Sequence, residues 1–109
     1  MKSVRKLLQD KSKPLVMPGV YDAIGAKIVE KVGFEAMFQT GYGTSATLFG
    51  MPDYGFIGST ETVDNARRIC HAVSTPVIVD ADTGYGNALS VWKLVQELEE
   101  VGASGIFLE

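Results

Sequence analysis

Short apolar runs alternate along this chain with longer segments whose apolar residues recur at helical spacing. The apolar runs occupy residues 15–17, 35–39, 76–80 and 104–109. Helix-like segments lie between them at residues 23–32, from 59 or 60 to about 72, and from 87 or 90 to 101, and a short helix is expected at residues 4–9. Strands that alternate with helices are typical of a parallel sheet covered by helices. The pattern therefore predicts an α/β fold.

The termini of these helices are marked by suitable capping residues. Asp22 is expected to cap the helix at residues 23–32, and Gly33 to end it. Ser59 or Thr60 is expected to cap the next helix, and Gly102 to stop the last one. Residues 40–58 are rich in glycine and are expected to form one long loop.

The length of the chain limits how much of a parallel α/β fold it can contain. Its 109 residues suffice for one small domain, whereas a complete (β/α)₈ barrel takes about 250 residues. Four strands with their helices correspond to about four βα units. We therefore expect residues 1–109 to be a single domain, the first half of a TIM (β/α)₈ barrel, truncated after the fourth strand.

Composition excludes several other classes of protein. Apolar residues make up 46% of the chain, the formal net charge is −3, and the basic residues do not form a patch with interleaved aromatics. A nucleic-acid partner is therefore not expected. No apolar run approaches the roughly 18 residues of a membrane helix, and the single cysteine fits a reducing compartment. We expect a cytoplasmic protein with no membrane partner.

The segment VIVDADTGYG, residues 77–86, carries the strongest chemical signal. Asp80 and Asp82 end an apolar strand, and a strict strand alternation would point both carboxylates to the same face. Like charges on one face repel, so a hard divalent cation such as Mg²⁺ is expected between them. Glu109, at the end of the neighbouring apolar run, would add a third carboxylate. Asp53 is either a further site residue or an ordinary turn aspartate.

The sequence TGYG occurs twice, each time directly after a predicted strand. The first copy is residues 40–43 and the second is residues 83–86. Carboxyl ends of parallel strands are where such folds build their sites. Gly41, Gly43 and Ala46 also match the spacing of a dinucleotide fingerprint, which requires a helix to open at the glycines; the glycines and proline that follow are expected to prevent that helix. Tyr42 and Tyr85 either line a pocket or serve packing.

From residue 15 to residue 109 the sequence resembles the phosphoenolpyruvate mutase and isocitrate lyase superfamily. The segment MPGVYDAIGAKIVEKVGFEAMF is similar to the opening strand–helix–strand of that family, and TGYGTSATLFGMPD to its substrate loop. DADTGYG is close to the family signature D-x-D-x-G-x-G, and GIFLE resembles the strand whose glutamate helps to bind the metal. The resemblance implies a (β/α)₈ barrel with Mg²⁺ or Mn²⁺ at the carboxyl ends of its strands.

The resemblance also implies roles for single residues. Asp80 would bind the metal directly, and Asp82 and Glu109 would hold metal-bound waters. Asp53 would act as the catalytic carboxylate that supports substrate and metal at the pocket wall. The segment Thr40, Gly41 and Tyr42 would bind the carboxylate of the substrate, with Thr40 in place of the serine common in the family. The cysteine-bearing loop that follows the fourth strand in the family's lyases is absent from this sequence.

The function implied is a Mg²⁺-dependent carbon–carbon lyase that forms a metal-stabilised enolate from a small 2-hydroxy di- or tricarboxylate, of the methylisocitrate or 2,3-dimethylmalate type. The proline of GMPD favours a lyase over a mutase. The alternatives are a phosphonomutase acting on phosphoenolpyruvate or carboxyphosphonoenolpyruvate, or an oxaloacetate-cleaving enzyme. A non-catalytic half-barrel is the alternative from another class. The family further implies a homo-oligomer, commonly a tetramer.

Overall fold

The structure, a computed structural model, describes residues 3–109. Its helices and strands alternate as the sequence predicts, with one additional helix. In chain order they are α1 (Val4–Gln9), β1 (Gly19–Val20), α2 (Ala23–Val32), β2 (Met37–Gln39), α3 (Gly41–Phe49), α4 (Ser59–Ala72), β3 (Val77–Asp80), α5 (Ala88–Glu100) and β4 (Gly105–Phe107).

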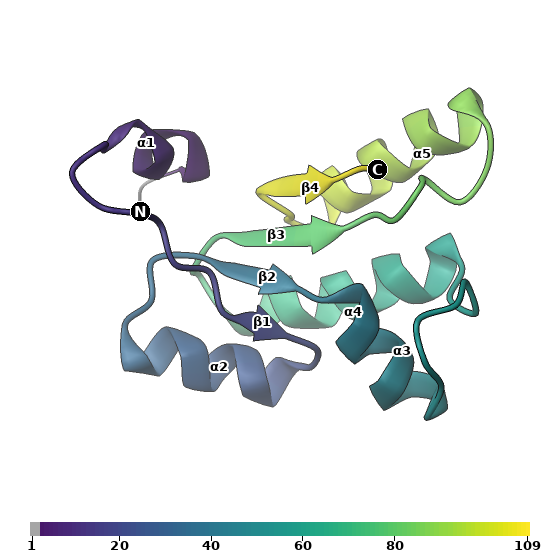
Figure 1. Ribbon diagram of the computed structural model, residues 1–109, viewed down its shortest axis with the longest axis horizontal. Helices are drawn as coiled ribbons and strands as arrows, with labels where there is room; N and C mark the ends of the chain where they lie inside the picture. Colours follow the sequence, from purple (N-terminus) through teal and green to yellow (C-terminus); the bar gives the residue numbers. More distant parts are fainter. Residues whose placement is uncertain (1–2) are drawn as a thin grey trace.

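The four strands form one parallel sheet in the order β1-β2-β3-β4. Each strand pairs with its neighbour in the sequence: Phe38 lies opposite Gly19 and Ile78, and Asp80 lies opposite Phe107. All carboxyl ends therefore lie at one edge of the sheet, on the right in Figure 1. This sequential parallel order is that of the first half of a (β/α)₈ barrel, which confirms the predicted fold class.

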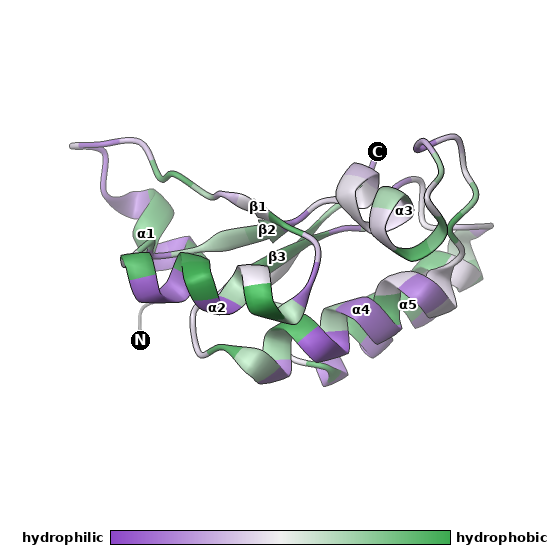
Figure 2. Ribbon diagram, turned by 90° about the horizontal axis from the view of Figure 1, so that it is seen from below, coloured by the Kyte–Doolittle hydropathy of each residue, from purple (hydrophilic) through white to green (hydrophobic). Residues whose placement is uncertain are grey.

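Helices α2, α4 and α5 lie side by side along one face of the sheet (Figure 2). The core forms between these helices and the strands, with Met37 and Val79 from the sheet packed against Ile69 and Leu98 from the helices. Phe38 and Phe107 have the opposite orientation in their strands and pack edge to face with ring centroids 5.2 Å apart. Helix α3 lies at the carboxyl edge of the sheet, and α1 lies at the amino edge (Figure 1).

The predicted caps of α2 are both present. The carboxylate of Asp22 accepts a hydrogen bond from the N–H of Gly25 at 2.7 Å, and Gly33 ends the helix with a left-handed φ of 107°. The prediction for α4 was wrong, because Gly58 is its N-cap and no side chain caps it. Helix α5 begins after Asn87, whose side chain accepts from the N–H groups of Leu89 and Ser90.

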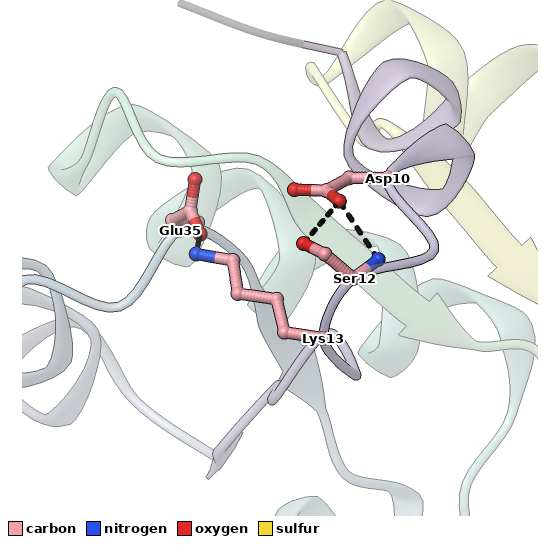
Figure 3. Close-up of polar contacts among 4 residues, drawn as sticks. All are labelled: Asp10, Ser12, Lys13 and Glu35. Carbon is pink, nitrogen blue, oxygen red and sulfur yellow. Dashed lines mark hydrogen bonds and ion pairs between the residues drawn. The ribbon is translucent and has the colours of Figure 1, made fainter.

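A polar turn connects α1 to the sheet (Figure 3). The Asp10 carboxylate accepts hydrogen bonds from the backbone N–H and the hydroxyl of Ser12. Lys13 then forms an exposed ion pair of 3.2 Å with Glu35, which stands before β2. These contacts join the segment before β1 to the segment before β2.

The first strand lies later in the chain than predicted. Residues 15–17 form the apolar run, but the paired residues are Gly19 and Val20. Hydrogen bonding decides the difference: the carbonyl of Pro18 accepts from the N–H of Phe38, and Val16 is largely exposed. Residues 15–17 therefore lead into the sheet and are not part of it.

The prediction that residues 40–58 form a single loop was wrong. Helix α3 occupies the first half, although Gly41 and Gly43 each disfavour a helix by about 1 kcal/mol relative to alanine. The hydroxyl of Thr40 accepts from the N–H of Gly43, Thr44 is buried, and Gly50 ends the helix in the left-handed conformation. Capping and burial offset the unfavourable helix propensity of the glycines. The glycines and proline that follow Ala46 therefore do not prevent a helix from opening at Gly41.

No helix within residues 3–109 combines the length and apolar character needed to cross a membrane.

Candidate metal and substrate site

Asp80 and Asp82 both line a small hollow at the carboxyl edge of the sheet. Asp80 is the last residue of β3, and its carboxylate accepts a hydrogen bond from the N–H of Asp82 at 2.9 Å. Asp82 itself lies beyond the strand with a left-handed φ of 50°. The strand-alternation argument was therefore wrong for Asp82, and the turn after β3, rather than the strand, places this residue.

Gly41, the first residue of α3, lies beside Asp80 and beside a third carboxylate, that of Asp53. A Cβ atom at position 41 would lie 2.7 Å from Oδ2 of Asp80 and 3.7 Å from Oδ2 of Asp53. Asp53, from the loop after α3, and Asp80, from the end of β3, therefore approach the same point. The Asp80 carboxylate also meets the amino end of α3, where the helix dipole favours negative charge.

Thr40 and Tyr42 flank Gly41 but have different surroundings. The hydroxyl of Thr40 caps α3, while the ring of Tyr42 is 67% exposed. Thr40, Gly41 and Tyr42 nevertheless share one short stretch of backbone at the amino end of α3. The first turn of a helix leaves N–H groups without intrahelical partners, so this stretch can donate to an anion through its backbone.

Glu109 is placed next to Asp82 through the backbone. Its N–H donates to the carbonyl of Asp82 at 2.8 Å, and its side chain is exposed. Among residues 3–109, no three histidine, cysteine, aspartate or glutamate side chains are grouped closely enough to hold a metal ion. Protein side chains alone therefore do not complete a coordination shell for the predicted trio Asp80, Asp82 and Glu109.

Tyr85, in the second TGYG copy, lines the hollow beside these carboxylates. Its hydroxyl lies 2.8 Å from the hydroxyl of Thr62 in α4, and its φ of 63° is left-handed. Burial raises the pKa of Tyr85, and the negative charges of Asp82, Asp80 and Asp53 raise it further. The phenol therefore stays protonated and able to donate a hydrogen bond at neutral pH. The sequence offered no signal for this contact, because Thr62 lies inside α4, 23 residues before Tyr85.

Three carboxylates thus converge on one hollow whose other lining residues, Gly41, Gly55, Ile57 and Tyr85, carry no positive charge. Three like charges near one another are unfavourable without a cation. Carboxylate oxygens are the ligands that hard divalent cations prefer. One or two of these carboxylates have the chemistry to hold Mg²⁺ or Mn²⁺, although no three acidic, histidine or cysteine side chains within residues 3–109 are close enough to enclose the ion.

Comparison with known proteins identifies the family. Residues 4–109 match the family model described as phosphoenolpyruvate phosphomutase, and the chain belongs to this family, within the phosphoenolpyruvate mutase and isocitrate lyase superfamily. The chain is 47% identical to 2,3-dimethylmalate lyase of Eubacterium barkeri over 97% of its own length and 36% of that protein. It is 48% identical to the chloroplastic carboxyvinyl-carboxyphosphonate phosphorylmutase of Arabidopsis thaliana over 87% of its length and 28% of that protein.

A solved structure supports the same relationship. The crystal structure of phosphonopyruvate hydrolase in complex with oxalate and Mg²⁺ superposes with a TM-score of 0.87 at 29% identity, over 98% of this chain and 38% of that one. The chain spans about a third of the length of the relatives that it matches.

Proposed function

We propose that this chain forms part of a Mg²⁺- or Mn²⁺-dependent carbon–carbon lyase that acts on a small 2-hydroxy di- or tricarboxylate, of the 2,3-dimethylmalate or methylisocitrate type. The observation that carries the proposal is the convergence of Asp53, Asp80 and Asp82 on one hollow at the carboxyl edge of the sheet. The similarity to 2,3-dimethylmalate lyase supports the choice of reaction. We also propose a homo-oligomer, as the family resemblance implies, and a cytoplasmic location, as the single cysteine favours.

In this proposal Asp80 is the direct ligand of the metal, and Asp82 and Glu109 hold water molecules bound to it. Asp80 suits this role because its Oδ2 faces Gly41 and its Oδ1 is held by the N–H of Asp82. Mg²⁺ commonly takes one or two protein carboxylates and keeps several waters. Such binding is compatible with the absence of a closed cluster of ligands among residues 3–109. The chemistry that the metal supplies when bound is stabilisation of negative charge on a substrate oxygen.

The amino end of α3 is proposed to bind a carboxylate of the substrate. The hydroxyl of Thr40 accepts a hydrogen bond from the N–H of Gly43, which orients the first turn of the helix. The N–H groups of Gly41 and Tyr42 belong to the same turn. Anions bind well at such positions because N–H groups and the helix dipole act together. Asp53, on the loop that follows α3, is proposed as the carboxylate that contacts both substrate and metal.

The second candidate is a phosphonomutase acting on phosphoenolpyruvate or carboxyphosphonoenolpyruvate. The similarity to carboxyvinyl-carboxyphosphonate phosphorylmutase favours it, at an identity close to that of the lyase. Oxaloacetate cleavage uses the same stabilisation of negative charge. A non-catalytic half-barrel is the third candidate, from another class of protein.

A panel of turnover assays separates these candidates, carried out on the whole protein of which residues 1–109 are proposed to be the first half. Residues 1–109 alone are expected to be inactive. We expect cleavage of 2,3-dimethylmalate or methylisocitrate that requires Mg²⁺, stops on addition of a chelator, and is lost in Asp80→Asn. Asp64→Asn is the matched control, because Asp64 lies in an exposed ion pair with Arg67 on α4. Turnover only of phosphoenolpyruvate, carboxyphosphonoenolpyruvate or oxaloacetate would replace the lyase assignment. No turnover of any substrate by the folded whole protein would favour the non-catalytic half-barrel.

A further inference from the structure

The two TGYG copies, which are 43 residues apart in the sequence, are joined in space by a single residue of α4. The backbone carbonyl of Thr62 accepts a hydrogen bond from Nε2 of Gln39 at 3.3 Å. Gln39 is the last residue of β2 and directly precedes the first copy. The side-chain hydroxyl of Thr62 is hydrogen-bonded to the hydroxyl of Tyr85, in the second copy, at 2.8 Å.

The bond to Gln39 is buried, and the bond to Tyr85 is partly buried. Thr62 is 3% exposed and Gln39 is 2% exposed. A buried polar group that loses its partner costs about 1–3 kcal/mol, so neither contact exchanges freely with solvent. Asn65, one turn further along α4, extends the connection: its amide donates to the carbonyl of Tyr21 and to the hydroxyl of Thr44 in α3. Helix α4 therefore presents a polar edge to the elements that carry the site.

The second copy and the residue before it need an anchor because their backbone is unusual. Asp82 and Tyr85 both have left-handed φ values, of 50° and 63°, and such conformations are rare in residues other than glycine. Gly84 permits the turn, since a Cβ there would overlap the side chain of Val91. The Tyr85 ring spans the distance between this turn and α4, so its hydroxyl contact restrains the orientation of the loop.

We propose that Thr62 is a positioning residue that couples the two TGYG loops and, through Tyr85, holds Asp82 where it can contribute to cation binding. Thr62 does not line the hollow and is not assigned any contact with substrate or metal. The cation-binding part of this inference rests on the proposed function. The coupling of the loops rests on the hydrogen bonds of Thr62 alone.

The simpler possibility is that Thr62 only packs α4 against the sheet. The two roles differ in what a loss of the hydroxyl changes. A packing residue replaced by valine, which has almost the same shape, leaves the cation affinity unchanged. A positioning residue replaced by valine weakens cation binding, and its effect depends on whether Tyr85 still has its own hydroxyl.

The test compares Thr62→Val, Thr62→Ser, Tyr85→Phe and the double variant Thr62→Val/Tyr85→Phe in the full chain. Mn²⁺ affinity is measured by isothermal titration calorimetry, and amide hydrogen exchange is followed at residues 40–44 and 81–86. We expect Thr62→Val and Tyr85→Phe each to weaken Mn²⁺ binding about three- to tenfold, as for one lost hydrogen bond. The double variant should bind Mn²⁺ with about the affinity of the more affected single variant, because both changes remove the same contact.

Thr62→Ser should retain both the affinity and the slow exchange of the wild type. Thr62→Val should speed exchange at residues 81–86, because it removes the hydroxyl that contacts Tyr85. Gln39→Leu, which removes the donor to the Thr62 carbonyl, should speed exchange at residues 40–44. Thr60→Val is the matched control, since Thr60 lies on the exposed side of α4. Wild-type binding of Mn²⁺ with unchanged affinity in Thr62→Val would overturn the positioning role. Absence of Mn²⁺ binding by the wild type would instead overturn the proposed function and, with it, the cation-binding part. Unchanged exchange at residues 81–86 in Thr62→Val, or at residues 40–44 in Gln39→Leu, would overturn the coupling itself.

Discussion

The carboxylate of Asp80 occupies the space where a side chain at position 41 would begin. Oδ2 of Asp80 lies 2.7 Å from the point at which a Cβ atom of residue 41 would stand. Real Cβ atoms do not approach an oxygen this closely, so one of the two groups has to move if residue 41 is not glycine. The first TGYG copy is thereby tied to the last residue of β3.

We predict that Gly41→Ala displaces the Asp80 carboxylate and weakens Mg²⁺ binding at least tenfold, because the added methyl group and the carboxylate cannot share the space. Calorimetric titration with Mg²⁺ measures the effect. Gly19→Ala is the matched control: a Cβ at position 19 would meet Thr40 at an ordinary 3.8 Å. Equal Mg²⁺ affinities for Gly41→Ala and the wild type would show that Asp80 does not need its present position.

A second prediction concerns Glu30, at the end of α2, and the pH dependence of stability. Its Oε2 accepts hydrogen bonds from the N–H groups and hydroxyls of Ser74 and Thr75, just before β3. The contacts to Thr75 and then Ser74 lower the pKa of Glu30 below its ordinary value of 4.5. Because the folded pKa is lowered, the stabilisation is fully present above the ordinary pKa of 4.5. It is lost as the pH falls from there through the lower, folded pKa.

We therefore expect Glu30→Gln to lower the melting temperature at pH 7, with a difference from the wild type that narrows as the pH falls below the ordinary pKa of 4.5. Thermal unfolding followed by circular dichroism at several pH values measures this. Glu35→Gln serves as the control, because the Lys13–Glu35 ion pair is exposed and such pairs contribute little. A difference that is constant over the whole pH range would mean that the Glu30 charge has no part in stability.

Cys70, in α4, is predicted to be a poorly reactive thiol. Burial raises its pKa from the ordinary 9.0 to about 11, and the thiolate is the reactive form. At pH 8 the folded chain should contain about 100-fold less thiolate than the unfolded chain, so alkylation by iodoacetamide should be slower by a comparable factor. Mass spectrometry of the adduct with and without urea gives the two rates; equal rates would contradict the burial of Cys70.

Most of the fold was predictable because it depends on local signals. The segment of α2 has its apolar spacing, its aspartate cap and its final glycine within twelve consecutive residues. The order of β2, β3 and β4 follows from apolar runs separated by helical segments. These signals act over short distances, so a single sequence carries them.

Helix α3 and strand β1 were not predictable in the same way, because distant contacts decide them. The glycines of α3 argue against a helix, and the burial of Thr44 against Asn65 of α4 argues for it only once the chain is folded. Likewise, the apolar residues 15–17 resemble a strand, but pairing with β2 begins at Gly19.

The candidate site shows the same division. Asp53, Asp80 and Asp82 were named from the sequence because each follows a strand or lies in a recognisable loop. The left-handed turn at Asp82 and the contact between Thr62 and Tyr85 were not predicted. A backbone angle and a hydroxyl contact between residues 23 positions apart leave no local pattern in the sequence.

Calorimetric titration of the full chain with oxalate, in the presence and absence of Mg²⁺, tests the central claim that these carboxylates form a cation-dependent site for a small dicarboxylate. We predict that oxalate binds the wild type only when Mg²⁺ is present, that Asp80→Asn abolishes this binding, and that Asp64→Asn leaves it intact. Oxalate binding of equal strength without Mg²⁺, or unchanged Mg²⁺-dependent binding in a folded Asp80→Asn variant, would contradict the account.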